Sequence, residues 1–400
     1  MRSICLVLLV TLIPSIAWSQ SALSNCADQF IDGNVENAPR VSTAAQGQPF
    51  SNNEHLCFRD DEASFFAIEY WPDHFAPRWA AYRLSPDNYG KNGCETLSRK
   101  KANCYVKADT WEDYQSCTSK SDPFHPDHML SGAKLGPNDF ASTGHDRGHI
   151  APRQAFSGNV CGTYQTFSMA NMSPQRGLLN QRIWQKLEKQ VLTWGFDEGP
   201  IYVATGTTFT RYPHERFEVY SDGGLDPTKI YGIDATMSSA VAQHHANHVA
   251  HDGSGHILEP GRDANPAKVK AKVEDMRMPT GYFKVIYRPA VGGEQAHAIG
   301  FLLPHTYENL NMLSDFYSNL TTAQAFWVFV SQIEVIEEVA GMKFPGISND
   351  LKAQWGDDFF FSRDTAEDLP RVECGARTAQ GILANSTKEE RLAACTDMLD

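Results

Sequence analysis

The chain has 400 residues, of which 42% are hydrophobic and 21% charged, and its formal net charge is −13. This length is enough for one large domain or two smaller ones with a substantial core. The acidic balance excludes a uniformly basic surface of the kind that binds a polyanion, so any such surface must be local.

Two segments of the chain carry a local excess of basic residues. Residues 78–107 contain seven Lys and Arg residues and two acidic residues, Asp87 and Glu95. Residues 145–190 contain six Lys and Arg residues and two acidic residues, Asp146 and Glu188. On charge alone, these segments are equally consistent with ordinary solvated faces. They nevertheless show that the acidic residues are concentrated elsewhere in the chain.

Residues 1–19 are predicted to be a signal peptide. Arg2 supplies a positive charge, residues 5–13 form an almost unbroken apolar stretch, and Ala17-Trp18-Ser19 is a small-x-small cleavage signal. The stretch is shorter than the roughly 20 residues that span a bilayer, and no later segment is long and apolar enough to do so. We therefore expect a secreted or periplasmic protein without a membrane partner, whose mature chain begins at Gln20.

Cysteine usage agrees with export. Cys5 lies in the signal peptide, and removing it from the nine cysteines leaves an even number, which predicts up to four disulfides. Cys374 and Cys395 are isolated in the C-terminal tail and are expected to pair with each other. The other cysteines lack the CxxC spacing of a zinc site, so structural disulfides are favoured over a metal cluster, with their connectivity left open. They are Cys26, Cys57, Cys94, Cys104, Cys117 and Cys161.

Apolar patterns predict the elements that follow. Residues 20–60 are polar and are expected to form an irregular N-terminal arm stapled by cysteines. Strands are predicted at 65–70, 79–84, 200–205, 282–287 and 298–303, and helices at 178–194 and 333–340.

The helix predicted at residues 178–194 carries two polar residues of interest. Its apolar positions recur at steps of three and four, which gives it a buried stripe. On an ideal helix Glu188 lies about 12 Å along the axis from Asn180 and roughly 80° around it. Both therefore border one side of the stripe, either as functional groups or simply as residues that flank a core helix.

A His-rich segment interrupts the predicted strands at residues 234–276. It contains five histidines, of which the first, third and fourth share a helical face: His244, His245, His248, His251 and His256. The segment lacks an apolar periodicity that would hold this face in place. A surface insertion is therefore favoured over a transition-metal site.

The residues that suggest chemistry lie in two short motifs. The first is Asp146-Arg147-Gly148-His149, and the second runs from Asn171 through Pro174-Gln175 to Asn180 and Glu188. Histidine can take a proton from water near neutral pH, an Asn amide oxygen can bind a hard cation such as Mg²⁺, and Arg presents a planar donor fork to phosphate. Together they predict metal-assisted hydrolysis of a phosphodiester.

These motifs, in this order and with these spacings, resemble the DNA/RNA non-specific endonucleases. This family of ββα-metal (His-Me finger) nucleases includes endonuclease G and secreted bacterial sugar-non-specific nucleases. Similarity continues at Trp79-Ala-Ala-Tyr82-Arg83 and in residues 202–206, 279–285 and 336–344, so that it covers roughly 60–346 apart from the His-rich insertion. The resemblance implies an α+β fold with a central antiparallel sheet flanked by helices.

The resemblance also implies roles for individual residues. His149 would be the general base, and Asn180 the sole protein ligand of Mg²⁺, with Mn²⁺ or another divalent cation as alternatives. Glu188 would hold a water bound to that metal. The substrates would be DNA and RNA, cleaved without sequence specificity because contacts to the phosphate backbone carry no sequence information.

Four further positions receive roles from the same resemblance. Arg83 would stabilise the phosphate in the transition state, and Arg147 would face the substrate or the hydrated metal. Asn171 would position either His149 or the phosphate. Asp146 is expected to be a structural partner within its loop.

The resulting organisation is a signal peptide at 1–19, an N-terminal arm at 20–60, a nuclease domain at 61–346 and a C-terminal extension at 347–400. Two other functions are weighed against an active nuclease. One is a secreted binding protein that keeps an inactive nuclease fold, which the presence of His149, Asn180 and Arg83 argues against. The other is a hydrolase of a different phosphodiester, or a zinc-binding protein centred on the His-rich segment. The sequence predicts no oligomeric state.

Overall fold

The computed structural model describes residues 22–42, 53–60, 62–85, 123–132, 134–141, 143–177, 179–209, 256–257, 276–279, 281–305, 329–354 and 356–361, with the single positions 104, 113 and 116. The predicted signal peptide, the Cys374–Cys395 pair, Cys94 and Cys117 lie outside the described residues. So does most of the His-rich segment, of which His256, Ile257 and Met276 are described; His256 and Ile257 form strand β8, paired with β9 (Arg277–Met278).

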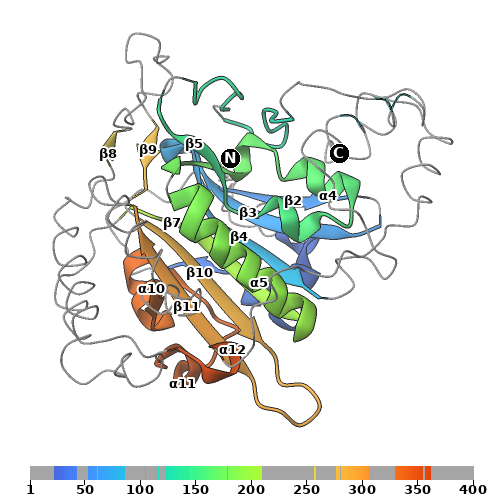
Figure 1. The fold of residues 1–400 in the computed structure, drawn as a ribbon, viewed down its shortest axis with the longest axis vertical. Helices are drawn as coiled ribbons and strands as arrows, with labels where there is room; N and C mark the ends of the chain where they lie inside the picture. The colour runs from blue at the N-terminus through green and yellow to red at the C-terminus, as the bar shows by residue number, and fades with distance from the viewer. Residues whose placement is uncertain are drawn as a thin grey trace, which may run out of the picture.

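A seven-stranded sheet forms the centre of the molecule, in the order β12-β11-β10-β7-β4-β3-β2 (Figure 1). Every neighbouring pair in this sheet is antiparallel. The strands are β2 (Glu54–Arg59), β3 (Ser64–Trp71), β4 (Ala76–Leu84), β7 (Ile201–Thr208), β10 (Gly281–Arg288), β11 (His297–Pro304) and β12 (Val330–Ser331). With helices on both faces, the prediction of an α+β fold around an antiparallel sheet is confirmed.

One face of the sheet is covered by the long helix, which crosses it diagonally in Figure 1. This helix begins as a π-helical stretch, η8 (Leu179–Trp184), and continues as α5 (Gln185–Asp197). Its apolar stripe packs on strand residues of one parity, such as Tyr82 and Val203, because successive strand side chains point to opposite faces. The site described below lies on this face.

The opposite face of the sheet is covered by α10 (Ile333–Ala340) and by the N-terminal segment. That segment forms the short 3₁₀ turns η1 (Ala27–Gln29), η2 (Ile31–Gly33) and η3 (Val35–Asn37), then β1 (Arg40–Val41), which pairs with β13 (Met342–Lys343). Phe30 packs edge-on against Trp79 of β4. A disulfide between Cys26 and Cys57 ties the segment to β2.

The two ends of the described chain belong to this same core. Residues 54–59 form the edge strand β2, so the expectation of an irregular arm at 20–60 is wrong for these residues: their apolar side chains complete the sheet. After residue 347, α11 (Asn349–Lys352) and α12 (Asp358–Phe361) pack beside the sheet, and Phe360 is fully buried against Trp194. The core therefore continues across residues 60 and 347.

The other sequence-predicted elements are present. Strands β3, β4, β10 and β11 cover the predicted ranges, β7 begins one residue after its predicted start at 200, and α10 matches its range from end to end. The long helix is also confirmed, but its first turn and a half is π-helical rather than α-helical. The angle of roughly 80° expected between Asn180 and Glu188 assumed a uniform α-helix and does not apply.

A separate hairpin lies beside the N-terminal end of the long helix. Its strands are β5 (Asp146–His149) and β6 (Met172–Gln175), joined through η6 (Arg153–Phe156), α4 (Val160–Gln165) and η7 (Met169–Asn171). Hairpin and helix together make a ββα unit (Figure 1). The 3₁₀ turn η4 (Pro72–His74) joins β3 to β4.

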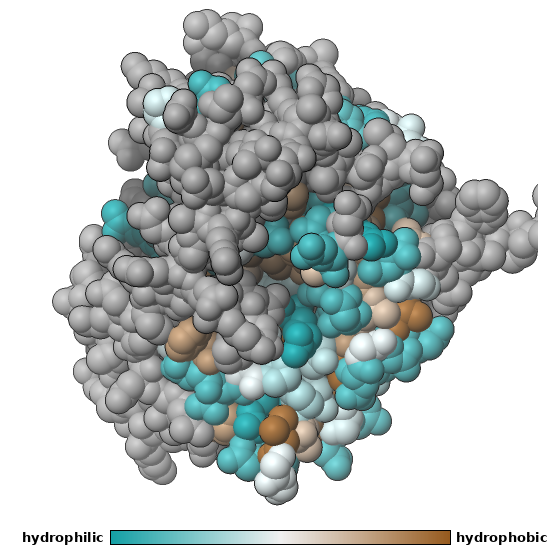
Figure 2. All heavy atoms as spheres, turned by 90° about the vertical axis from the view of Figure 1, so that its right-hand side faces the viewer, coloured by the Kyte–Doolittle hydropathy of each residue, from teal (hydrophilic) through white to brown (hydrophobic). Residues whose placement is uncertain are grey.

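The described surface is largely polar. Figure 2 shows one side of the molecule, on which hydrophilic side chains dominate the described area and apolar ones occur in small groups. Val291 is the large hydrophobic residue that is most exposed within the described chain. None of the described helices has the length and apolar character needed to cross a membrane.

Candidate active site

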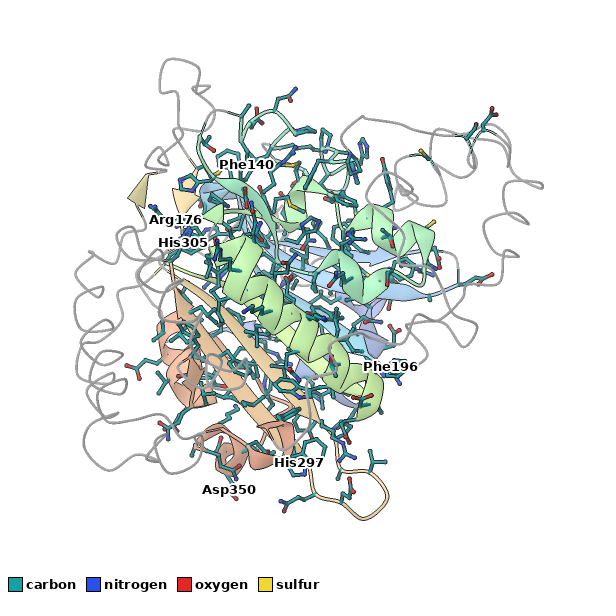
Figure 3. All side chains as sticks on the ribbon, viewed as in Figure 1. Phe140, Arg176, Phe196, His297, His305 and Asp350 are labelled. Carbon is teal, nitrogen blue, oxygen red and sulfur yellow. A yellow bond between two sulfur atoms is a disulfide. The ribbon has the colours of Figure 1, made fainter. Side chains whose placement is uncertain are left out.

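The ββα unit is fixed to the central sheet through β6. The Tyr282 hydroxyl on β10 donates to the Pro174 carbonyl oxygen at 2.8 Å, and lies 3.1 Å from Ser173 Oγ. The backbone N–H of Arg176 donates to His305 Nε2 at 3.0 Å, and Figure 3 shows these two residues beside each other. His305 Nδ1 lies 3.0 Å from the Pro279 carbonyl oxygen. Burial holds the pKa of His305 well below its usual value, so the ring is a neutral connector.

His149 is the last residue of β5, paired with Met172 of β6. Its ring is partly buried and rests between two aromatic rings, with centroid distances of 5.6 Å to Phe124 and 5.2 Å to Phe167. These contacts leave the imidazole few alternative orientations. A base must be held in place to act on a proton, and this packing supplies that constraint.

Asn171 fixes the backbone that follows His149. Its side chain is fully buried, its Oδ1 accepts from the Ala151 N–H at 2.8 Å, and its Nδ2 donates to the carbonyl oxygens of Ala151 and Thr166, both at 2.9 Å. The amide of Asn171 is thus buried, and both its donors are used by backbone groups. This places Asn171 as a support of the chain that follows His149, the first of its two expected roles, while its role in the reaction stays a prediction.

Asn180 lies in the π-helical stretch, where its side chain meets the first residue of β5. Asn180 Nδ2 donates to Asp146 Oδ2 at 3.0 Å, and Gln181 Nε2 donates to the same oxygen at 2.8 Å. The carboxylate thus engages the nitrogen end of the Asn180 amide and leaves the oxygen end for a cation. Asp146 is a structural partner, as expected, but across to the helix rather than within its own loop.

Glu188 lies two turns further along the helix, above a buried lysine of the sheet. Lys284 of β10 is fully buried, its Nζ donates to Thr205 Oγ1 at 3.1 Å, and it lies 4.6 Å from the ring centroid of Trp184. Burial raises the pKa of Glu188, while the Lys284 ammonium opposes this rise. Burial also lowers the pKa of Lys284, against the attraction of Glu188. The two groups form an electrostatic pair beneath the helix.

Arg147 shares an aromatic partner with His149. The two residues alternate along β5 and therefore point to the same side of the strand. The guanidinium carbon of Arg147 lies 3.8 Å from the ring centroid of Phe124, and its Nη1 donates to the Pro137 carbonyl oxygen at 3.1 Å. This cation–π contact holds a positive charge beside the imidazole.

Arg83 does not join these residues. It alternates on β4 with Ala81 and Trp79, which belong to the core on the α10 face, whereas Tyr82 packs on the α5 face. Its backbone N–H donates to Gln29 Oε1 of the N-terminal segment. Strand alternation therefore directs the side chain of Arg83 away from His149 and Asn180, and the structure does not bring it together with them as its expected role at the phosphate would require.

Gln175 is a site residue to which sequence reasoning gave no role. It ends β6 opposite Asp146, is fully buried, and neither Oε1 nor Nε2 makes a hydrogen bond within the described part of the chain. Its side chain fills the space beside Gly148, where an added Cβ would lie 2.1 Å from Oε1. The sequence did contain one signal for this contact, the glycine between Arg147 and His149, because a glycine is typical of a position where another group approaches the backbone closely.

The donor set suits a hydrated hard cation. Asn180 offers an amide oxygen, and Glu188 Oε1 is buried without a hydrogen-bond partner among the described residues. Such a cation binds few protein groups and keeps most of its waters, which match the unused Glu188 and Gln175 atoms. Within the described residues no group of three His, Cys, Asp or Glu side chains could hold a metal ion.

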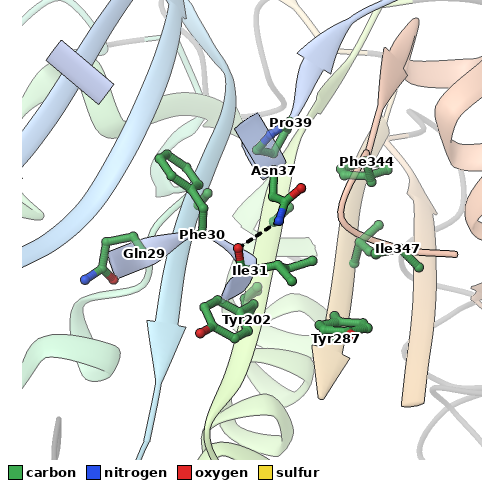
Figure 4. A pocket seen from close by; sticks show the side chains of 13 residues that line it. Gln29, Phe30, Ile31, Asn37, Pro39, Tyr202, Tyr287, Phe344 and Ile347 are labelled. Carbon is green, nitrogen blue, oxygen red and sulfur yellow. Dashed lines mark hydrogen bonds between the residues drawn. The ribbon is translucent and has the colours of Figure 1, made fainter. Parts of the chain in front are cut away.

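A small, half-open pocket lies on the other face of the sheet (Figure 4). It is lined by residues of the N-terminal segment, β7, β10 and the chain after β13, among them Ile31, Tyr202, Tyr287 and Phe344. Asn37 at its edge donates to the Ile31 carbonyl oxygen and so closes the segment on itself. This pocket is separated by the sheet from His149 and Asn180.

Comparison with known proteins gives one family match. Residues 46–347 match the model of the family described as DNA/RNA non-specific endonuclease. A nuclease of Nostoc sp. (strain PCC 7120 / SAG 25.82 / UTEX 2576) is 31% identical over 113 residues, which cover 26% of this chain and 41% of that protein. The mitochondrial endonuclease G of Bos taurus is 32% identical over 87 residues, covering 22% of this chain and 29% of that protein. The chain thus spans less than half the length of these relatives.

A solved structure of an EndoG/EndoGI complex, concerned with the mechanism of EndoG inhibition, also resembles the chain. The two are 17% identical with a TM-score of 0.44, and the alignment covers 74% of this chain and 91% of that one.

Proposed function

Because the chain belongs to the DNA/RNA non-specific endonuclease family, we propose that it is a divalent-metal-dependent endonuclease that hydrolyses the phosphodiester bonds of DNA and RNA without sequence specificity. One observation carries this proposal. The short strand β5 holds Asp146, bound to the Asn180 amide, at one end and His149, packed between two aromatic rings, at the other. A cation ligand and a base are thereby fixed by the same rigid element.

In the proposed reaction each residue has a distinct task. His149 takes the proton of the attacking water. Arg147, held on Phe124, presents a positive charge to the phosphate, and Asn171 keeps the end of β5 in place. Glu188 accepts hydrogen bonds from water near Asn180, and it does so most strongly when its carboxyl is deprotonated, because both oxygens then act only as acceptors.

The cation itself is proposed to be Mg²⁺ or Mn²⁺, held by Asn180 Oδ1. When bound, it would stabilise the negative charge that develops on the phosphate oxygens. Groups that act on phosphate read the backbone and not the bases, and an enzyme that makes no contact with the 2′-hydroxyl does not distinguish RNA from DNA.

The test is a digestion of DNA and RNA side by side with the full chain, titrated with Mg²⁺ and Mn²⁺. We expect both nucleic acids to be cut, with internal cleavage of a circular plasmid, and activity to disappear with EDTA and return with added metal. Absence of cleavage with every divalent metal would refute the proposal, and so would cleavage that EDTA does not reduce.

We further propose that the protein is exported. The apolar stretch at residues 5–13 and the Cys26–Cys57 disulfide support this, since disulfides persist in oxidising compartments. N-terminal sequencing of the protein recovered from its host should begin near Gln20. Recovery of the chain with Met1 intact in the reducing compartment would contradict export.

A further inference from the structure

The outward face of the long helix has a charge pattern that the proposed chemistry does not use. Its exposed residues between positions 179 and 189 are Gln181, Arg182, Gln185, Lys186 and Lys189. None of them is acidic, although the whole chain has 48 acidic residues against 35 basic ones. The next exposed residue of the helix is Asp197, at its far end.

Three cations therefore follow one side of the helix, starting next to the proposed metal ligand. We call Arg182, Lys186 and Lys189 the cationic stripe. Lys186 and Lys189 lie three residues apart on one face of α5, and Arg182 lies about one turn earlier, in the π-helical stretch, so that the three span on the order of 10 Å along the axis. Within the described part of the chain, no salt bridge is formed by Arg182 or Lys186.

The direction of the stripe relates it to the site. It begins two residues after Asn180, and the helix then runs away from the hairpin across the sheet (Figure 1). Glu188, the acidic residue within this span, is only partly exposed, with its Oε1 buried, and so does not belong to the exposed outer face. The charge on the helix thus changes from basic near the site to acidic at Asp197.

Charge complementarity selects the partner. A duplex strand advances about 3.4 Å per nucleotide, so a stripe of about 10 Å is as long as roughly three nucleotides. We propose that the cationic stripe binds the backbone phosphates of a substrate strand on one side of the scissile bond. This inference rests on the proposed nuclease function, and it adds a binding track outside the catalytic residues.

The track contributes affinity through release of counterions. Each phosphate contact steepens the dependence of log K on log salt by about 0.9 for duplex DNA and about 0.7 for a single strand. Neutralising Arg182 and Lys186 should therefore reduce the slope by about 1.8 for a duplex. Between about 50 and 200 mM KCl, the unsubstituted stripe should lose about 12-fold more affinity than the neutralised one.

The experiment compares two double variants in a full chain that carries His149→Ala, so that the probe is not cut. One is Arg182→Gln with Lys186→Gln. The matched control is Arg40→Gln with Lys343→Gln, which removes the same charge from partner residues of β1 and β13 on the other face. Binding of a labelled 20-base-pair duplex is followed by fluorescence anisotropy at several KCl concentrations.

We expect the slope of log K against log salt to be smaller by about 1.8 in the stripe variant than in the chain with the unsubstituted stripe. The control variant should keep the slope of the unsubstituted stripe. An unchanged slope in the stripe variant overturns the proposal and leaves an acidic protein as the alternative partner of the stripe. An equal loss of slope in the control variant also overturns it.

A second assay separates this inference from the proposed function. Hydrolysis of bis(p-nitrophenyl) phosphate, which has no flanking phosphates, is measured with His149 intact. If the intact chain cleaves neither this ester nor DNA, the nuclease proposal fails. If it cleaves both and the salt slope does not change, only the binding track fails.

Discussion

The contact between Asp146 and Asn180 gives the sharpest prediction about the metal site. Asp146 Oδ2 accepts two amide hydrogen bonds, one from Asn180 and one from Gln181. Replacing Asp146 by Ala removes the acceptor and leaves the Asn180 amide free to rotate, so that its oxygen no longer faces a fixed position. The predicted result is weaker binding of the divalent cation without loss of the fold.

The size of the effect follows from the kind of contact that is lost. A hydrogen bond to a charged group contributes about 1.5–3 kcal/mol, and loss of a partner that orients a metal ligand typically costs about 10–100-fold in metal affinity. A 10–100-fold loss corresponds to about 1.4–2.7 kcal/mol, which is within the range of one such bond. We therefore expect the apparent Mg²⁺ constant of Asp146→Ala to rise by about 10–100-fold.

The assay is the rate of plasmid cleavage as a function of Mg²⁺ concentration, with thermal unfolding to verify the fold. Gln181→Ala is the matched control, because it removes the other donor to the same oxygen and keeps the bond to Asn180. Its Mg²⁺ constant should stay within about threefold of the parent, as for a solvent-exposed hydrogen bond of modest energy. Equal Mg²⁺ constants in Asp146→Ala and the parent protein would refute the reasoning.

Three further predictions concern the surroundings of the site. Lys284→Met removes the cation that opposes the rise in the pKa of Glu188. The acid limb of the pH profile of kcat/KM should therefore move to higher pH by about one unit, and an unmoved limb would contradict the interaction between Glu188 and Lys284. Gly148→Ala should destabilise the fold by about 1–3 kcal/mol through the clash with Gln175, and adding Gln175→Ala should recover most of this in thermal unfolding. Arg83→Gln should leave the cleavage rate within about twofold, since its effect is that of an ordinary surface change; a loss of a hundredfold or more would restore Arg83 to the site.

Strand and helix patterns could be predicted where one face of an element is buried. The alternation in β4 and the stripe in α10 both repeat the geometry that the structure shows. Strand β2 could not be found in this way, because its apolar residues stand within a polar stretch and depend on pairing with β3. Long-range pairing of this kind leaves no local periodicity.

Sequence patterns placed the candidate site residues on their strands and helix, but they did not give the directions of the side chains. The alternation of β4 already places Arg83 with Trp79 and opposite Tyr82, but only the packed sheet shows which side faces the helix. The burial of Asn171 depends on backbone groups of Ala151 and Thr166, which no pattern reveals. Lys284 did leave a signal, since a lysine within an apolar strand needs a partner when it is buried.

The central claim is that His149 and Asn180 perform two separable tasks, and one paired measurement tests it. The rate of DNA cleavage and the Mn²⁺ dissociation constant are measured for His149→Ala and for Asn180→Ala. We predict that His149→Ala loses about 10²–10⁴ in rate and binds Mn²⁺ like the parent, whereas Asn180→Ala binds Mn²⁺ at least about tenfold more weakly. A His149→Ala protein that cuts DNA at the parental rate, or an Asn180→Ala protein with unchanged Mn²⁺ affinity, would contradict the account.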